Sequence, residues 1–477
     1  MSRDNGAFPR PDRNFAVMAC SEGAQKALTL LLFMVLSRML TVEENGVYGL
    51  FVSLFPLLVV LLNMGLSDIA VREIARAPEQ TGRLIAAALA GQTLIGALLL
   101  AAVPVLWFLL PDGDPAVRWV LVATLPATLP FVWGRTVLSV FSGREHFGPV
   151  AVLQVALRAA VVAATLAVLF LGASVPVLVA LLAPVHLVWA LAVAAWARRH
   201  AVSPITAPGA VRPRWMLAEG APVAVGGVIA TLYFGMDLFL LRPFVDPEAL
   251  GQYALAVRFL IMLLPLADLL GTVFYPVFSR KTLDAPDGAG GAFLRGCAAA
   301  MSLGVPMAAG TLLLARPVTV FLAGEKFLPA APAVAALAAS AALFLPACIG
   351  QMQLRARGMQ GRAAVILGVA AALKAALVLG FAPGHGADAA VWANLAVGAL
   401  LAAGLVLLAG RGMSARWPWL AAHTLRVVLS TALMAGALWP LREMPVPLTV
   451  PAGMAVFLAG MFVFAPLSRR FGGTPSW

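Results

Sequence analysis

Fourteen long apolar segments run through the 477 residues of this chain, and they constrain its fold more than any other feature. Each has about the 20 residues that a helix needs to cross the hydrocarbon core of a bilayer. They are too long and continuous for barrel strands, which have about ten residues of alternating polarity. The chain is 62% hydrophobic and 11% charged, with a mean hydropathy of +0.94, which no water-soluble core explains. The sequence therefore predicts an all-α polytopic membrane protein with about 14 transmembrane helices.

The expected spans are divided among three groups. Six fall in an N-terminal lobe at 15–197, six in a C-terminal lobe at 216–409, and two extra helices lie within 421–467, with a Pro-rich cytoplasmic linker at 198–215. In order, the spans lie near 15–40, 47–66, 84–110, 119–141, 150–171, 177–197, 216–241, 251–278, 296–323, 332–353, 364–382, 389–409, 421–439 and 449–467.

The net charge of +12 is divided unequally between the two sides of the membrane. With Met1 in the cytoplasm, about 21 Lys and Arg residues fall in inside tails and loops and about 4 outside. This is the positive-inside pattern, so the basic character indicates topology and not a nucleic-acid partner. An even number of spans agrees with it, and both termini are expected in the cytoplasm.

Short motifs of the first half recur in the same order about 200 residues later. Ser21-Glu22-Gly23-Ala24 is matched by Ala218-Glu219-Gly220-Ala221, and Gly46-Val47-Tyr48 by Gly251-Gln252-Tyr253. Because six spans is an even number, both copies start on the same side of the membrane and are parallel repeats. We therefore expect two six-helix lobes in a parallel pseudo-twofold repeat, with a transport cavity between them and the last two helices appended.

Basic residues within the spans give the sharpest functional signal, because each costs at least about 2.5–3.5 kcal/mol at a helix centre. Those near span ends can extend their long side chains to the headgroups, and this explains Arg38, Arg135, Arg316 and Arg426. Four others lie deeper: Lys26, Arg158, Arg258 and Lys374. Since Arg and Lys favour phosphate, these four are candidate ligands of an anionic cargo in an aqueous cavity.

Two acidic residues, Glu219 and Asp237, fall within the seventh predicted span. In the first copy Glu22 is followed by Lys26 four residues later, so these two either pair with each other or contact the cargo. Val223 stands at the corresponding position after Glu219, which is therefore expected to lack a partner. An unpaired carboxylate in a membrane takes up a proton or binds a cation, so Glu219 and Asp237 are candidate ion-coupling residues, unless they lie at a span end in water.

Enzyme motifs are absent from the sequence, which has no Walker P-loop, no H-E-x-x-H and no G-x-S-x-G. Asp112-Gly113-Asp114 is a D-x-D on an expected outside loop, where a glycosyltransferase would hold a metal, but Pro-Asp-Gly-Asp-Pro is also ordinary turn chemistry. Three scattered cysteines lack metal-ligand spacing. We therefore expect no enzyme activity, no cofactor and no metal site.

The order of the motifs along the chain resembles that of the Wzx-type polysaccharide or O-antigen flippases. In the first half the resemblance rests on Ser21, Glu22 and Lys26 and on residues 36–40, 44–49, 65–66 and 70–76, and in the second half on residues 220–222, Asp237, 251–253 and 275–280. It implies the multidrug/oligosaccharidyl-lipid/polysaccharide exporter superfamily and two helix bundles around a central cavity. Many such flippases have twelve spans, and the two extra C-terminal spans are similar to those of the related lipid II flippases.

The function implied by this resemblance is flipping of an undecaprenyl-diphosphate-linked oligosaccharide, by alternating access, from the cytoplasmic to the periplasmic leaflet of the bacterial inner membrane. The implied partners are the lipid-linked glycan, membrane lipids and other proteins of polysaccharide assembly. Two alternatives belong to other classes: a cation-coupled multidrug antiporter of the same superfamily, and a membrane-embedded lipid-sugar glycosyltransferase. The basic interior disfavours the antiporter, and the lack of a large outside loop disfavours the enzyme.

Overall fold

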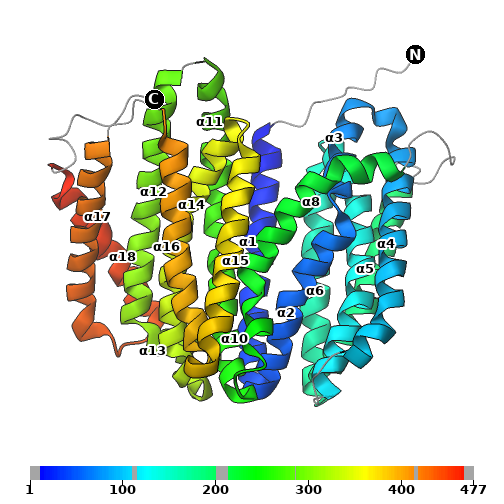
Figure 1. Ribbon diagram of the computed structural model, residues 1–477, viewed down its shortest axis with the longest axis horizontal. Coiled ribbons are helices and arrows are strands. Elements are labelled where there is room, and N and C mark those ends of the chain that lie inside the picture. Colours follow the sequence, from blue (N-terminus) through cyan, green and yellow to red (C-terminus); the bar gives the residue numbers. More distant parts are fainter. Residues whose placement is uncertain (1–10, 110–114, 200–212, 285, 413–416, 467–477) are drawn as a thin grey trace. The chain divides into compact units, whose positions relative to one another are not determined.

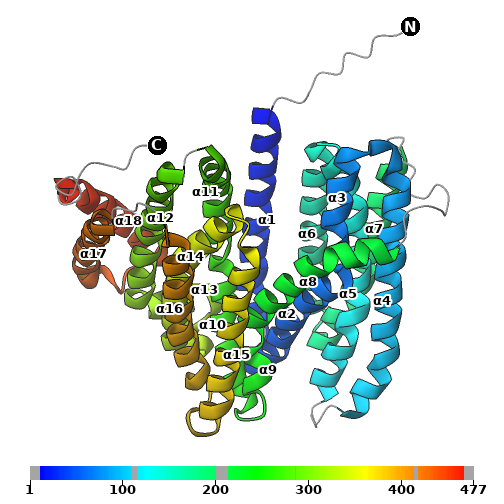
Figure 2. The same cartoon turned by 45° about the horizontal axis from the view of Figure 1, so that its top comes forward.

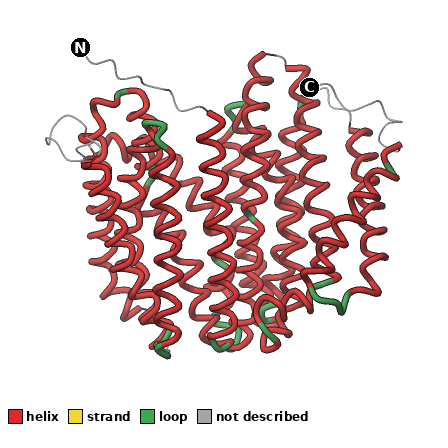
Figure 3. The backbone as a smooth tube through the Cα atoms, turned by 180° about the vertical axis from the view of Figure 1, so that it is seen from behind, coloured by secondary structure: helices red, strands yellow, loops and turns green. Residues whose placement is uncertain are grey.

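The computed structural model describes residues 11–109, 115–199, 213–284, 286–412 and 417–466, and these ranges contain helices and short connections without strands (Figure 3). Within them, 14 helical stretches are long and apolar enough to cross a membrane. The predicted all-α class and number of spans are therefore confirmed. Residues 200–212 of the expected linker and the Asp112-Gly113-Asp114 loop lie outside the described residues.

The described helices follow one another along the chain (Figure 1). The α-helices are α1 (Pro11–Met39), α2 (Val42–Asn63), α3 (Leu66–Arg76), α4 (Thr81–Leu109), α5 (Pro115–Gly143), α6 (Phe147–Phe170), α7 (Val175–Arg199), α8 (Pro213–Gly235), α9 (Asp237–Leu241), α10 (Pro247–Leu263), α11 (Pro265–Asp284), α12 (Pro286–Leu313), α13 (Ala315–Ala323), α14 (Ala331–Ala356), α15 (Gln360–His385), α16 (Asp388–Gly410), α17 (Trp417–Leu438) and α18 (Val446–Val463). Three 3₁₀ turns accompany them: η1 (Pro78–Gln80), η2 (Glu325–Ala330) and η3 (Trp439–Leu441).

The chain forms two compact units. Unit 1 consists of Met1–Met39 and Leu50–Thr231, and unit 2 of Leu40–Gly49 and Leu232–Trp477. Helices α2 and α8 each contribute to both units, because the boundaries fall inside them.

The core of unit 1 forms where α5 packs along α7. Trp189 on α7 lies directly against Gly134 on α5, where a Cβ atom would approach the indole ring to 2.2 Å. The indole Nε1 donates to the carbonyl of Leu153 on α6 at 2.8 Å, so the buried polar group of this large ring has a partner. On the other side of α6 lies α1, joined to it by a hydrogen bond between the amides of Gln25 and Gln154 at 3.3 Å.

A sharp corner joins α2 to α3 in unit 1. Asn63 Oδ1 accepts from the backbone N–H of Ser67 at 3.2 Å and from its hydroxyl at 2.6 Å. Gly65 has a φ of 71°, a left-handed conformation that favours glycine. It also lies against Gly220 of α8, whose carbonyl oxygen would be 2.8 Å from a Cβ on Gly65. The sequence does not predict the short helix α3 (Figure 2). It buries Leu66, Ile69, Ala70 and Ile74 and exposes Arg76.

In unit 2 the most buried span contains α14, which packs against α10, α11, α12 and α16. The two C-terminal helices, α17 and α18, pack on each other, and α17 also packs on α12. Arg426 of α17 donates to the carbonyl of Met461 on α18 through Nε at 2.8 Å, and Ser302 of α12 is 3.0 Å from His423 of α17. The first contact joins the last two helices to each other, and the second attaches α17 to α12.

The starts of α2 and α10, which carry the similar motifs Gly46-Val47-Tyr48 and Gly251-Gln252-Tyr253, lie in contact in unit 2. Thr41 and Glu44 form a capping box at α2, and Asp246 caps α10 by accepting from the N–H of Ala249 at 2.7 Å. Asn45 Nδ2 donates to the carbonyl of Gly251 at 2.8 Å. A Cβ on Gly251 would lie 1.9 Å from the carbonyl oxygen of Val42, so only glycine allows this approach.

Candidate functional site

The strongest polar cluster in the described part of unit 2 surrounds Asp237, the first residue of α9. Its Oδ1 atom lies 2.9 Å from the ammonium nitrogen of Lys374 on α15. The side chain of Lys374 has no exposed surface and that of Asp237 is 3% exposed. Both charged groups are therefore buried inside unit 2, where they neutralise each other.

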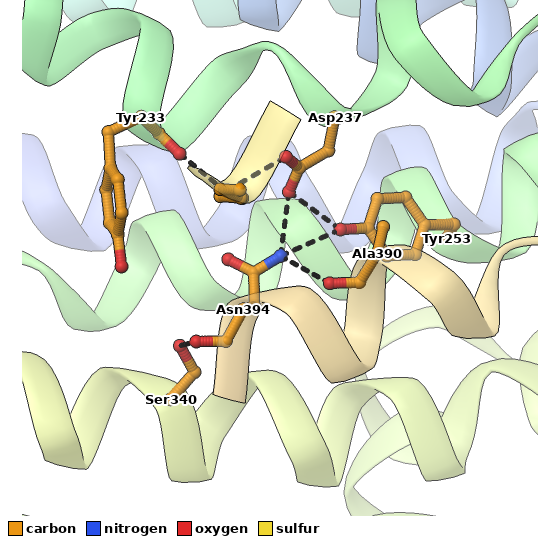
Figure 4. Close-up of polar contacts among 7 residues, drawn as sticks. Tyr233, Asp237, Tyr253, Ser340, Ala390 and Asn394 are labelled. Carbon is orange, nitrogen blue, oxygen red and sulfur yellow. Dashed lines mark hydrogen bonds and ion pairs between the residues drawn. The ribbon is translucent and has the colours of Figure 1, made fainter. Parts of the chain in front are cut away.

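The second carboxylate oxygen of Asp237 is also occupied (Figure 4). Tyr253 on α10 donates its hydroxyl proton to Oδ2 at 2.8 Å, and the amide of Asn394 on α16 donates to the same atom at 2.8 Å. The Asn394 amide also donates to the carbonyl of Ala390, one turn earlier, at 2.8 Å. Three side chains from three different helices thus converge on one carboxylate.

A helix interruption places these groups. Helix α8 ends at Gly235 and α9 begins at Asp237, so the last carbonyl groups of α8 lack their usual intrahelical donors. One of them, the carbonyl of Tyr233, accepts a hydrogen bond from the Lys374 ammonium. The same ammonium lies 4.8 Å from the centre of the Tyr233 ring, within cation–π distance. Lys374 is therefore held by a carboxylate, a carbonyl dipole and a ring face.

Such a cluster is energetically demanding. Taking two charges out of water costs several kcal/mol per ion, and the cost is recovered only when the geometry is good and further hydrogen bonds satisfy the remaining polar atoms. Around Asp237 the contacts with Lys374, Tyr253 and Asn394 meet both conditions. The cluster can hold one positive charge beside one negative charge in a site closed to solvent in this conformation.

Of the other basic candidates, Arg258 lies on α10, in the same unit as Lys374. It is buried, and its guanidinium carbon is 5.2 Å from the centre of the Tyr48 ring on α2. Lys26 and Arg158 lie in unit 1 on α1 and α6, which pack together. Lys26 is exposed and Arg158 is half-buried. The structure therefore brings Lys374 to Asp237 and puts Lys26 and Arg158 on neighbouring helices.

The expectation that Glu219 lacks a partner is wrong. Its Oε1 atom lies 3.1 Å from a guanidinium nitrogen of Arg72 on α3, and Arg72 is also 2.9 Å from Glu73. The hydrogen bonds that Arg72 donates to Glu73 and to Glu219 raise the pKa of Arg72 above its ordinary value. Arg72 and Glu219 are 147 residues apart in the sequence, so the spacing of residues along the helix of Glu219 does not reveal the pair. The premise that Asp237 is unpaired is wrong for the same reason, since its partner is Lys374.

Two members of the cluster, Tyr253 and Asn394, are not among the site residues that the sequence predicts. Tyr253 belongs to the repeated Gly251-Gln252-Tyr253 motif, and its aromatic hydroxyl in an apolar span was the available signal. Asn394 is a single amide in the apolar run of α16, which is unusual in a membrane span. As for metals, no group of three or more His, Cys, Asp or Glu side chains that could hold an ion occurs among the described residues.

Residues 12–281 match a protein family described as "Polysaccharide biosynthesis protein". Among curated proteins nothing matches the sequence. Solved structures with the same fold include "Lipid II flippase MurJ, inward closed conformation", with a TM-score of 0.76 and 13% identity over 94% of this chain and 98% of that one.

Two transporters also share the fold. An inward-facing multidrug resistance MATE family transporter of the MOP superfamily aligns with a TM-score of 0.66 and 17% identity over 81% of this chain and 94% of that one. A MOP superfamily transporter from Pyrococcus furiosus, described as having a binding pocket of reverse polarity, aligns with a TM-score of 0.56 and 14% identity over 83% of this chain and 92% of that one. The chain is thus a multi-pass membrane protein with the fold of these transporters. The part of this chain that does not align with the lipid II flippase has fewer residues than α17 and α18 together. The alignment therefore includes at least part of these two helices.

Proposed function

Because the chain belongs to the polysaccharide biosynthesis protein family, we propose that it is a flippase for a lipid-linked oligosaccharide. The cargo is an undecaprenyl-diphosphate-linked glycan, carried from the cytoplasmic to the periplasmic leaflet of a bacterial inner membrane, with both termini of the chain in the cytoplasm. The observation that carries the proposal is the family match over residues 12–281. The fold shared with a lipid II flippase supports it.

Transport then proceeds by alternating access of two six-helix lobes, at 15–197 and 216–409. A cargo shifts the equilibrium between inward and outward states only by its different affinity for the two, so net flux needs a gradient of cargo, ion or voltage. Of the two carboxylates expected to couple an ion, Glu219 is the more accessible, with 44% of its side chain exposed beside Arg72. We keep Glu219 as the candidate for ion coupling.

The diphosphate of the cargo is recognised by basic side chains within the spans. Lys26 and Arg158 are the first contacts, because one is exposed, the other is half-buried, and their helices pack together. Arg258 is covered by Tyr48 of α2 in this conformation, and separation of α2 from α10 would uncover its guanidinium. Lys374 differs from these three because its ammonium is bound to Asp237.

A cation-coupled drug antiporter is the alternative that the fold also accommodates, given the MATE structures that share it. The two functions differ in the charge of the cargo: deep basic residues attract a diphosphate and repel a cationic drug. A membrane-embedded glycosyltransferase is a weaker alternative, since the sequence has no large outside loop to hold an acceptor.

Ligand binding to the purified protein separates these functions. We expect undecaprenyl diphosphate to raise the melting temperature and tetraphenylphosphonium to leave it unchanged. Replacing Arg158 with Gln should weaken diphosphate binding about tenfold or more, because a hydrogen bond to a charged group is lost. Arg83→Gln, at an exposed position of α4, is the matched control and should bind like the wild type. Binding of tetraphenylphosphonium without binding of the diphosphate would favour the antiporter.

A further inference from the structure

The oxygen atoms around the Lys374 ammonium form a set that would suit a small monovalent cation. They are a carboxylate oxygen of Asp237 at 2.9 Å and the backbone carbonyl of Tyr233 at the end of α8. Carboxylates and the C-terminal carbonyls of interrupted helices are the groups that hold Na⁺ or a proton in membrane proteins. In this chain that position is filled by the end of a lysine side chain from α15.

We infer that Lys374 is an internal counter-ion, which occupies with the chain's own ammonium a monovalent-cation site built from Asp237 and the interrupted helix α8–α9. Because Lys374 supplies the counter-ion, Asp237 stays buried in unit 2 without a proton or a cation from solution. The site has this property whatever cargo the chain carries.

The geometry fits a tethered cation better than a cargo ligand. The ammonium is completely buried, and its carboxylate partner is 3% exposed, so no phosphate reaches it in this conformation. The other titratable groups around this pair in the described structure are Tyr253, which donates to Asp237, and Tyr233, whose ring centre lies 4.8 Å from the Lys374 ammonium. The hydroxyl of Tyr253 already donates to the carboxylate, so the one positive charge in the site comes from Lys374.

Removing the lysine ammonium should therefore create a need for a solution cation. In Lys374→Met the side chain keeps its bulk but loses its charge, and Asp237 remains buried among Tyr253 and Asn394. A buried carboxylate without a counter-ion is strongly unfavourable, so it either takes up a proton or binds Na⁺ or K⁺. The double variant Asp237→Asn/Lys374→Met removes both charges and is the matched control.

The test is the melting temperature of the purified full-length protein, with choline chloride replaced stepwise by NaCl or KCl at constant ionic strength. The wild type and the double variant should not respond. Lys374→Met should melt lower in choline and recover with the cation, by on the order of 1–2 °C per tenfold increase once the site begins to fill. A parallel pH series in choline distinguishes a proton from a metal cation: recovery on acidification alone identifies the proton as the substitute.

Two outcomes would overturn the inference. One is a folded Lys374→Met protein that responds neither to Na⁺, to K⁺ nor to pH, because its carboxylate would then need no counter-ion. The other is a wild type that is stabilised by Na⁺ or K⁺ while the double variant is not, because a solution cation would then bind at Asp237 despite Lys374. This second comparison decides the question even where Lys374→Met does not fold.

Discussion

Asp237 is in contact with Lys374, Tyr253 and Asn394. If the charge of Asp237 is removed, Lys374 stays buried without a counter-ion. Breaking a buried pair by changing one partner typically costs about 3–5 kcal/mol, whereas changing both to neutral groups costs much less. We therefore predict that Asp237→Asn and Lys374→Met each lower the free energy of unfolding by about 3–5 kcal/mol.

A double-mutant cycle on thermal or denaturant unfolding checks this prediction. The double variant should be more stable than the sum of the single effects implies, with a coupling energy of about 3 kcal/mol or more. Additive, mild effects of the two changes would contradict the description of the pair as a buried ion pair.

The ion pair between Glu219 and Arg72 is exposed, whereas the pair between Asp237 and Lys374 is buried. Both side chains are about two-fifths exposed, so solvent and salt screen their attraction. The two carboxylate partners of Arg72 raise its pKa in the folded protein. The charged Arg72 therefore contributes fully to folding stability below its ordinary pKa, and this contribution is lost only as the pH rises through the raised pKa. Arg72 therefore stays charged throughout the neutral range.

We accordingly predict that Glu219→Gln shifts the melting temperature far less than Asp237→Asn does, and that its effect shrinks at high salt. Melting curves of both variants at low and high NaCl, between about pH 6 and 9, measure this. A large, salt-independent loss in Glu219→Gln would show that the carboxylate is structural.

At the scale of helices, the contact between the starts of α2 and α10 depends on Gly251, where a Cβ would lie 1.9 Å from the carbonyl oxygen of Val42. Because the obstructing atom belongs to the backbone, the two helices must move apart to accept a side chain. We predict that Gly251→Ala destabilises the protein by about 1–3 kcal/mol, as overpacking does.

Gly361→Ala is the matched control, since nothing lies within 4 Å of a Cβ at that exposed position of α15. Alanine there should be neutral or stabilising by up to about 1 kcal/mol, because glycine is the poorer helix former. Equal unfolding curves for the two variants would contradict the close approach of α2 and α10.

Helices also show what the sequence predicts well and what it does not. The 14 spans were predictable because each depends on the local excess of apolar residues that a membrane requires. The corner at Gly65 and the interruption before Asp237 depend on backbone geometry and distant partners, so hydropathy misses them. For the same reason the types of residue at the candidate site could be selected, but the pairing of Asp237 with Lys374 could not.

At the scale of the whole molecule, the distribution of charge predicts the topology. The basic loops alternate with loops that carry almost no Lys or Arg, which orients a membrane protein with its basic loops inside. We predict that reporter fusions after Arg199 and at Trp477 both report the cytoplasm, and that a fusion after Glu443, in the loop before α18, reports the periplasm. A periplasmic signal after Arg199 would refute both the orientation and the parallel repeat.

The central claim is that this chain moves a lipid-linked oligosaccharide across a bilayer. The direct measurement is flipping of a labelled undecaprenyl-diphosphate oligosaccharide in liposomes, followed by the accessibility of the sugar to a membrane-impermeant reagent. We predict that liposomes with the wild-type protein expose inner-leaflet cargo faster than protein-free liposomes. Arg158→Gln should slow this flipping about tenfold or more, and Arg83→Gln should not change it. Flipping no faster than in protein-free liposomes, with a protein that is folded and correctly inserted, would contradict the claim.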